Sequence, residues 1–447
     1  MDDAKNLWAI WQYLLRWFQQ VFTSPGWVRF AQWVTGLVLC DEEHTITQEV
    51  TTLNLVDQWR NWESFAEYGS FDIRQVESQT QRLVEREHPS SFAGYHMKAA
   101  DDTKELRSSR DIWGVCTYAH RNGRNPNRPK LVMAHNWVVC GDLVPGNGHE
   151  PWTYLPTASR LYLRQSQLPP GETFATKDQM VLQMLQQANA DSLLKLLALL
   201  DGGLAHGPLL RGCLEQPRPI NFITRPRSDA RIYRPLPPEK KAASTQSRRR
   251  GKRKRGRKPQ WGKRLPAPCK HRSWRIPWQS GKTWVYGRVR TFRCKMLECH
   301  WSVTGPRQLV HVFVFEVDGY EKPWYLVTSA LDLTAAQVLE AYAARFRLED
   351  GIRDHKQRMG MEQVRAWTKN PILRTFCMQQ LAITLLRLMQ WRLEADGVPC
   401  FTPSPWNPRK TRTSLLDLRR LLWRCRREFS QFTQRLGELR KYHARAA

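Results

Sequence analysis

Apolar and polar residues follow two different periods along the chain, and together they predict a protein of mixed α and β structure. Apolar residues recur every three or four positions in residues 1–20 and again in residues 372–393, which is the period of an amphipathic helix. Runs rich in Val and aromatic residues around residues 131–140 and 309–317 are typical of strands, and residues 94–103 are predicted as a further short strand. We therefore expect an α+β or α/β fold in which helices flank a mixed sheet.

Acidic residues follow two of the predicted strands. The strand that begins at Gly94 leads into Asp101-Asp102-Thr103, which we place at its end. The apolar run of residues 193–200 is followed by Asp201 and two glycines. Periodicity alone does not separate a strand from a helix in this second run. A helix that starts after the predicted N-cap Thr176 precedes the run, so the pair forms a crossover unit and favours a strand.

A charged stripe is predicted between Tyr342 and Lys356. A helix starting after the N-cap Thr334 should run through this segment. At about 100° per residue, Tyr342, Arg345, Glu349 and Lys356 fall within an arc of about 60° on one helix face. One carboxylate between cations and a phenol suits an anionic substrate and a divalent metal. A solvated face with incidental ion pairs explains the spacing alone equally well.

The pattern Tyr342-x2-Arg345-x3-Glu349-x6-Lys356 resembles the YREK signature of DDE transposases from bacterial insertion sequences. The resemblance implies an RNase H-like core on which Glu349 is the third metal-binding acid. It also implies that Tyr342, Arg345 and Lys356 contact transposon-end DNA.

The same resemblance assigns the other two acids. In such transposases a triplet of an acidic residue, Asp and Thr marks the first catalytic acid, and Asp101-Asp102-Thr103 is similar; we place the ligand at Asp102, just before Thr103, with Asp101 as the alternative. The strand that ends at Asp201 resembles the setting of the second acid. Asp102, Asp201 and Glu349 are thus the predicted catalytic residues and metal ligands, and oxygen ligands favour two Mg²⁺ (or Mn²⁺) ions.

Charge supports a nucleic-acid partner. The chain carries 70 Lys and Arg against 41 Asp and Glu, a formal charge of +29, which favours a polyanion such as DNA. A basic run from Arg248 to Arg264 is too highly charged to pack by itself and should bind phosphates, although a plain solvated linker is the alternative. The predicted contact residues in this run are Arg248, Arg249, Arg250, Lys252, Arg253, Lys254 and Arg255.

We expect five regions along the chain. They are an all-α module at 1–92 that either binds end DNA or supports the core, the first part of the RNase H-like core at 93–234, an insertion at 235–330, the last part of the core at 331–396, and a basic C-terminal helix at 397–447. The insertion combines the basic run with a β-rich subdomain, and the resemblance makes one of its tryptophans a candidate to hold a flipped base. The candidates are Trp284, Trp301 and Trp324, for each of which core packing is the more ordinary role.

The cysteines and apolar segments exclude other classes. The ten cysteines are scattered, and the nearest approach to a zinc pattern, Cys269-x-His271 with Cys294-x4-Cys299-His300, lacks the usual paired C-x2-C. Free thiols are therefore expected. No apolar run reaches about 18 residues without a charge, and the N-terminus lacks the basic region of a secretory signal. We expect a cytoplasmic, nucleoid-associated bacterial protein with no membrane partner.

The function that follows is a DNA transposase that cuts and joins the ends of a mobile element. Its partners would be double-stranded DNA, namely the inverted-repeat ends and the target, and the active assembly would be a homodimer on two ends. Two alternatives remain open at this point. One is a catalytically inactive DNA-binding protein on a transposase fold, and the other is a structure-specific nuclease on the same RNase H core.

Overall fold

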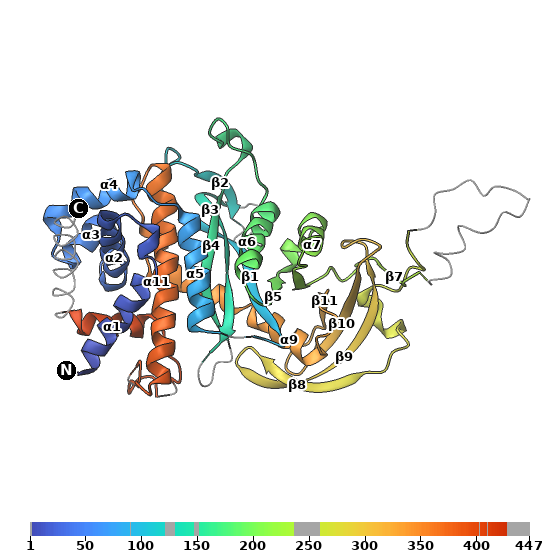
Figure 1. Cartoon of the computed structure of the whole chain (residues 1–447). Coiled ribbons are helices and arrows are strands. Elements are labelled where there is room, and N and C mark those ends of the chain that lie inside the picture. Colours follow the sequence, from blue (N-terminus) through green and yellow to red (C-terminus); the bar gives the residue numbers. More distant parts are fainter. Residues whose placement is uncertain are drawn as a thin grey trace, which may run out of the picture. The chain divides into compact units, whose positions relative to one another are not determined.

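The computed structural model describes residues 2–89, 91–120, 130–146, 152–236, 260–401, 403–408 and 410–426. It consists of two compact units (Figure 1). Unit 1 comprises Met1–Ser90, Ala100–Leu193 and Arg347–Ala447, and unit 2 comprises Ser91–Ala99 and Leu194–Phe346. Several of the predicted site residues therefore belong to different units. Among the described residues, no helix is both long and apolar enough to cross a membrane.

The N-terminal part of unit 1 is helical, as its apolar periodicity predicts. Polar side chains start three of its helices: Thr23, Thr45 and Asp72 each accept a hydrogen bond from a backbone N–H of the first turn. The helices are α1 (Asp2–Arg16), α2 (Ser24–Leu39), α3 (Ile46–Thr52), α4 (Trp59–Tyr68) and α5 (Ile73–Glu87).

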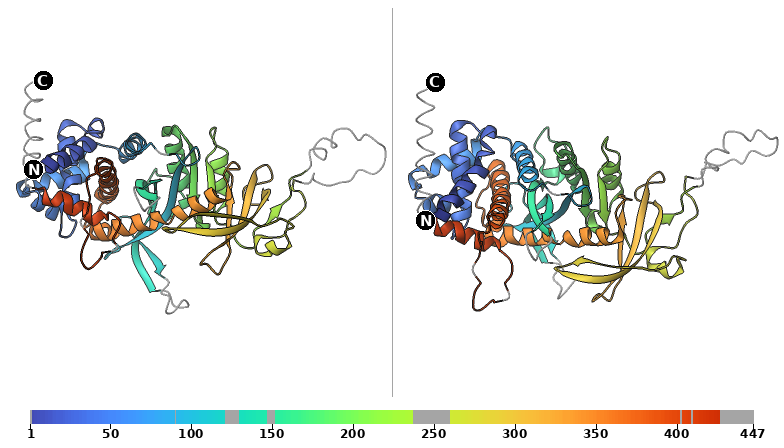
Figure 2. Two further views of the ribbon diagram at one scale, coloured as in Figure 1. Left: turned by 90° about the horizontal axis from the view of Figure 1, so that it is seen from below. Right: turned by 60° about the horizontal axis from the view of Figure 1, so that its bottom comes forward.

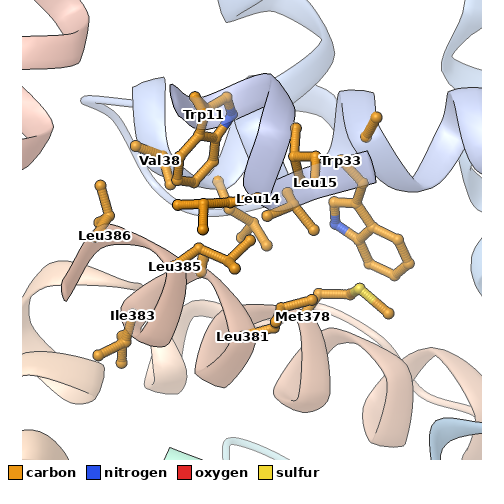
Figure 3. Close-up of a cluster of buried hydrophobic side chains, with 14 of the residues drawn as sticks. Trp11, Leu14, Leu15, Trp33, Val38, Met378, Leu381, Ile383, Leu385 and Leu386 are labelled. Atoms are coloured by element: carbon orange, nitrogen blue, oxygen red, sulfur yellow. The ribbon is translucent and has the colours of Figure 1, made fainter. Parts of the chain in front are cut away.

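A long helix, α11 (Lys369–Ala395), is the centre around which these helices pack. Figure 3 shows Trp11, Leu14 and Leu15 of α1 facing Leu381 and Leu385 of α11. Helices α1, α2, α4 and α5 contact α11, and so does strand β4 (Trp152–Tyr162). The helix therefore has apolar residues around most of its circumference, as expected for a helix buried between layers. The blue N-terminal helices lie beside the orange α11 in every view (Figure 2).

The strands of unit 1 form a small antiparallel group. Strand β3 (Lys130–Pro145) pairs with β2 (Cys116–His120) on one side, and β4 also pairs with β3. The order continues from β3 to β1 (Tyr95–Leu106), whose first residues belong to unit 2. Helix α6 (Lys177–Asp191) follows β4 and starts with a capping box formed by Thr176 and Gln179.

Two predictions about these strands need correction. Strand β1 does not end at the acids but continues to Leu106, because Glu105 has buried hydrogen-bond partners on β3. The sequence analysis also missed β4. Its alternation is interrupted by Pro156, which lies where the register with β3 shifts at Cys140 and Gly141.

Unit 2 contains the second half of the mixed sheet. Its strand order is β1, β5 (Lys195–Leu200), β6 (Asn221–Thr224), β11 (Trp324–Thr328), β10 (Leu309–Val317), β9 (Arg288–Trp301) and β7 (Ile232–Tyr233), with β8 (Gln279–Val285) paired to β9. Strands β5 and β6 are parallel and are joined by α7 (Gly207–Leu214). The prediction of a strand at residues 193–200 is confirmed. Tyr286 and Gly287 both have positive φ and turn the chain from β8 into β9 as a hairpin.

The predicted RNase H-like class, a mixed sheet flanked by helices, is confirmed. An antiparallel group, β1, β3 and β4, is followed by α6 and then by the parallel pair β5 and β6. The remaining α-helices of the described residues are α9 (Ala335–Ala344), α10 (Arg347–Arg358) and α12 (Leu415–Arg424), and Ser414 caps the start of α12. Short 3-10 helices lie at Gln19–Val21, Val56–Gln58, Gln165–Gln167, Gly202–Leu204, Pro268–Ser273 and Met361–Gln363.

The single helix predicted through Tyr342 and Lys356 is wrong. Helix α9 ends at Ala344, and α10 begins at Arg347. At the break, the amide of Phe346 bonds to the carbonyl of Ala343, three residues back, at 3.2 Å, which interrupts the regular four-residue ladder. The Phe346 ring packs near Tyr286 instead, with 5.2 Å between centroids. One ideal helix therefore does not place all four residues of the signature on one face.

Candidate active site

The two neighbouring acids of β1 face opposite sides of the sheet. Successive side chains of a strand point in opposite directions. Asp102 therefore shares a face with Lys104, whereas Asp101 shares the other face with Thr103 and Glu105. The partners of these residues show which helices cover each face.

Asp102 faces helix α6. Its Oδ2 lies 2.5 Å from the Nζ of Lys177, the first residue of α6. Asn136 of β3 completes the group: with its amide turned to satisfy both neighbours, it donates to Asp102 Oδ2 at 3.0 Å and accepts from Lys177 at 2.7 Å. The Lys177 ammonium also lies over the ring of Tyr162, 5.8 Å from its centroid. The carboxylate of Asp102 is therefore engaged in binding α6 to the sheet.

The face of Asp101 is covered by α10 and α11. Glu105 on this face is 1% exposed and accepts a hydrogen bond from the indole of Trp137 at 2.7 Å. Arg107, two residues further along, lies 2.6 Å from Glu105 and donates to the carbonyl of Val364, in the segment between α10 and α11. The Trp137 ring stacks on Phe376 of α11, with centroids 3.7 Å apart. Asp101 and Thr103 therefore point towards the side of the sheet where α10 lies.

Helix α10 is held against the strands at two levels. Near its start, Gly351 packs against the ring of Tyr154 on β4, so closely that a Cβ on Gly351 would lie 2.4 Å from Tyr154 Cδ1. Near its end, Lys356 donates from Nζ to the backbone oxygen of Lys104 at 2.7 Å. Its neighbour His355 is fully buried, and burial lowers its pKa to about 4.

Helix α10 and strand β1 run in the same direction, because Gly351 lies near the Asp101 level of β1 and Lys356 lies at the Lys104 level. Burial raises the pKa of Tyr154 well above its usual range, and the nearby Cys140, Asp142 and Asp101 raise it further. Tyr154 thus links Gly351 with the Asp101 level of β1, while Lys356 lies at the Lys104 level. Glu349 stands two residues before Gly351 and is exposed. It lies seven residues before Lys356, which places both on one helix face within about 20°. Glu349 therefore lies in the first turn of α10, the end of the helix that is near the Asp101 level of β1.

Asp201 lies in unit 2, where the predicted strand-then-acid arrangement is present. It follows β5 directly and caps a short helix by accepting hydrogen bonds at Oδ1 from the amides of Gly203, at 2.5 Å, and Leu204, at 3.1 Å. Its Oδ2 makes no hydrogen bond within the described part of the chain. This second oxygen is available to a ligand.

Tyr342 lies near Arg345, Arg225 and Asp201 within unit 2. Burial raises the pKa of the Tyr342 phenol, the cations Arg345 and Arg225 lower it, and Asp201 raises it again. The Arg345 guanidinium lies over the Tyr342 ring, 5.9 Å from its centroid. One acid, one phenol and two cations therefore share this part of unit 2.

The sequence analysis missed several groups around these acids. Arg225 follows strand β6 and was not predicted as a site residue, because a single Arg after a strand does not by itself indicate a function. Lys177 and Asn136 are polar residues whose relation to Asp102 depends on strand pairing, which the sequence does not show. Glu105 was passed over because the strand was expected to end before it. The seven predicted basic residues of 248–255 lie outside the described residues.

No metal site of the zinc type is present in the described part. No three His, Cys, Asp or Glu side chains are grouped there so as to hold a metal ion. All ten cysteines are free, as predicted, and burial raises the pKa of the Cys294 thiol to about 11 and that of Cys299 to about 12. Trp301 and Trp324 are buried, whereas Trp284 is half-buried.

Comparison with known proteins gives the family. Residues 18–283 match the family model described as a DDE superfamily endonuclease. The chain belongs to this endonuclease family. The match includes Asp101, Asp102 and Asp201 but ends before Glu349 and the YREK-like segment. Within the DDE superfamily the acids act with divalent metal ions.

Other comparisons add little detail. No curated protein matches this DDE endonuclease. A solved structure that resembles it is that of piggyBac transposase in a synaptic complex with hairpin DNA, with a TM-score of 0.38, 11% sequence identity, and coverage of 90% of this chain and 71% of that chain.

Proposed function

We propose that this DDE endonuclease is a DNA transposase that cuts and joins the ends of a mobile element. The observation that supports it best is the arrangement of β1 and α10: Asp101 shares the face of β1 on which α10 packs, and α10, which carries Glu349 in its first turn, is held to β1 by Lys356. The net charge of +29 agrees with a DNA substrate.

The acids proposed to hold the metal are Asp101, Asp201 and Glu349. No three such side chains form a ready-made metal site among the described residues, so we propose that they come together when metal and DNA bind. This choice replaces Asp102 with its neighbour, because Asp102 is already bound to Lys177 and Asn136 on the other face. Three carboxylates are hard oxygen donors and fit Mg²⁺ or Mn²⁺. Two such ions, when bound, would neutralise charge on the scissile phosphate and lower the pKa of a bound water or 3′-hydroxyl.

The remaining residues would position the DNA. Arg345 and Arg225, close to Tyr342 and Asp201, are cations that suit phosphate oxygens. Lys356 instead makes its bonds within the protein, to Lys104 and to Glu362 at 3.3 Å, and so acts as a positioning residue for α10. The basic residues Arg248–Arg255 would add phosphate contacts that weaken with salt.

The test is cleavage of DNA that carries the inverted repeats flanking the gene. The wild-type protein should nick these ends in the presence of Mg²⁺, and Glu349→Gln should lower the rate by at least about 100-fold, as expected for the loss of a metal-binding acid. Asp350→Asn is the matched control, since Asp350 pairs with Arg347 and Arg353 on α10. Equal rates for wild type and Glu349→Gln would remove Glu349 from the mechanism.

Two further substrates separate the alternatives. A scrambled end sequence should not be cut if the protein is a transposase. Branched DNA or an RNA–DNA hybrid cut regardless of sequence would instead indicate a structure-specific nuclease. Binding to the correct ends without any metal-dependent cleavage would indicate a DNA-binding protein that has lost catalysis.

A further inference from the structure

A cavity lies in unit 1, among helices α2, α3 and α4 and the segment that leads into α11. Its volume is about 550 Å³, which is enough for a small organic molecule. The proposed transposase chemistry uses none of the residues that line it. Two of its lining side chains, Glu49 and Trp33, are buried, and each has one polar atom without a hydrogen-bond partner among the described residues.

Glu49 is a buried acid whose carboxyl group is not satisfied. The residue is 1% exposed, and its Oε2 has no hydrogen-bond partner in the described part of the chain. Glu49 lies on α3 and contributes to the cavity wall. A buried carboxyl without a partner is costly, and such groups usually have a ligand, a water or a functional reason.

Trp33 adds an unsatisfied donor to the same wall. It is 1% exposed, and its indole Nε1 makes no hydrogen bond of regular geometry among the described residues. The indole is still near enough to Glu49 to lower the pKa of that carboxyl, although burial raises it by more. The two groups therefore lie next to each other in the cavity wall.

The rest of the wall favours a positive ligand. Glu63 and Glu67 add two carboxylates, and the exposed rings of Trp367 and Tyr68 lie at the same cavity. The two arginines of the wall are already engaged: Arg365 lies 3.0 Å from Glu43, and Arg60 lies over the ring of Trp59. The acids and rings of this cavity therefore contrast with the strongly basic chain as a whole.

We propose that this cavity binds a small organic cation, an alkylammonium or a guanidinium on a short aliphatic stem. On binding, Glu49 would release its proton to the solvent and its carboxylate would pair with the cationic head, while the stem would lie against Trp33 and Trp367. The carboxyl gains a partner that removes the cost of its burial, and the aromatic rings add cation–π attraction. The occupant is recognised by its charge and its narrow apolar body.

The experiment is calorimetric titration of the full-length protein with agmatine and, separately, putrescine, without DNA or Mg²⁺. At least one of the two should bind with a dissociation constant below about 1 mM. The neutral analogue 1,4-butanediol should not bind. Glu49→Gln keeps the shape of the side chain and should weaken binding by at least tenfold, while Glu42→Gln, a change to an exposed acid outside the wall, should leave it unchanged.

A second variant keeps the proposal testable if Glu49→Gln does not fold. Trp367 is 55% exposed, so Trp367→Ala should leave the fold intact and weaken binding several-fold. Circular dichroism checks that each variant is folded. The proposal is overturned if neither cation binds to the wild type, or if both bind folded Glu49→Gln as tightly as wild type. Because DNA and metal are absent, this result is independent of the cleavage assay.

Discussion

The side chain of Lys356 donates a hydrogen bond to the backbone oxygen of Lys104 across 2.7 Å. The bond joins α10, which carries Glu349, to β1, which carries Asp101. A side chain bound to a backbone carbonyl fixes the helix without depending on the identity of the residue at position 104. The relative placement of two proposed metal ligands in unit 1 thus depends on a residue that is itself not a ligand.

Lys356→Met should therefore impair cleavage more than DNA binding. Methionine keeps most of the length of the side chain but removes the donor, so α10 loses its tie to β1. We expect at least a tenfold lower single-turnover cleavage rate, with the dissociation constant for end DNA and its salt dependence nearly unchanged. The two quantities are measured by gel-based cleavage and by fluorescence anisotropy at several salt concentrations.

The opposite pattern would contradict this role. A residue that contacts a phosphate contributes to the slope of binding against salt. If Lys356→Met weakens binding and reduces that slope by about one, then Lys356 contacts DNA as the sequence resemblance implies.

Gly351→Ala should destabilise unit 1, because the new Cβ would lie 2.4 Å from Tyr154 Cδ1. Alanine is the better helix former, so propensity alone would predict the reverse. Overpacking of this kind costs about 1–3 kcal/mol. Urea denaturation of the variant should show a lower midpoint, and Tyr154→Leu in the same chain should recover part of the loss. A midpoint equal to or above that of wild type would mean that α10 does not pack on β4 at this glycine.

Stability should fall on acidification below neutral pH. Burial lowers the pKa of both His44 and His355 to about 4, whereas an unfolded histidine titrates near about 6.5. Between these values the unfolded state binds protons that the folded state does not. The contribution of each histidine to stability is therefore complete above about pH 6.5 and is lost towards pH 4. Each histidine contributes a slope of up to about 1.4 kcal/mol per pH unit.

The check is the unfolding free energy at about pH 7, 6 and 5 for wild type and for His355→Gln, in which the introduced amide can still bond to Gln379. The variant should show a shallower loss on acidification. Burial also raises the pKa of Glu49 well above its ordinary value. A protonated buried acid contributes stability that falls as pH rises, so Glu49 opposes the effect of the histidines on the pH dependence of stability. An identical slope in wild type and variant would show that His355 does not titrate in this range.

Sequence patterns predicted the elements better than their boundaries. The helices of the N-terminal part and α11 follow from their apolar period, and the strand before Asp201 follows from the helix that Thr176 caps just before it; these are local signals. The break at Arg345 and Phe346 does not, because an ideal helical spacing continues through it. The cause is tertiary: the Phe346 ring has its partner in Tyr286 on a distant hairpin.

The choice between Asp101 and Asp102 shows the same limit. Both are acidic, adjacent and next to a strand, so no local pattern separates them. Their difference arises from what packs on each face of β1, with Lys177 and Asn136 on one side and α10 on the other. These contacts join residues that are far apart in the sequence.

The central claim is that Asp101, and not Asp102, acts with Glu349 in metal-dependent cleavage. Single-turnover cleavage of the inverted-repeat ends in Mg²⁺ by Asp101→Asn and Asp102→Asn, side by side, tests it most directly. We predict that Asp101→Asn lowers the rate at least about 100-fold, whereas Asp102→Asn remains within about tenfold of wild type because it only weakens the bond to Lys177. A protein that loses cleavage with Asp102→Asn and retains it with Asp101→Asn would contradict the account.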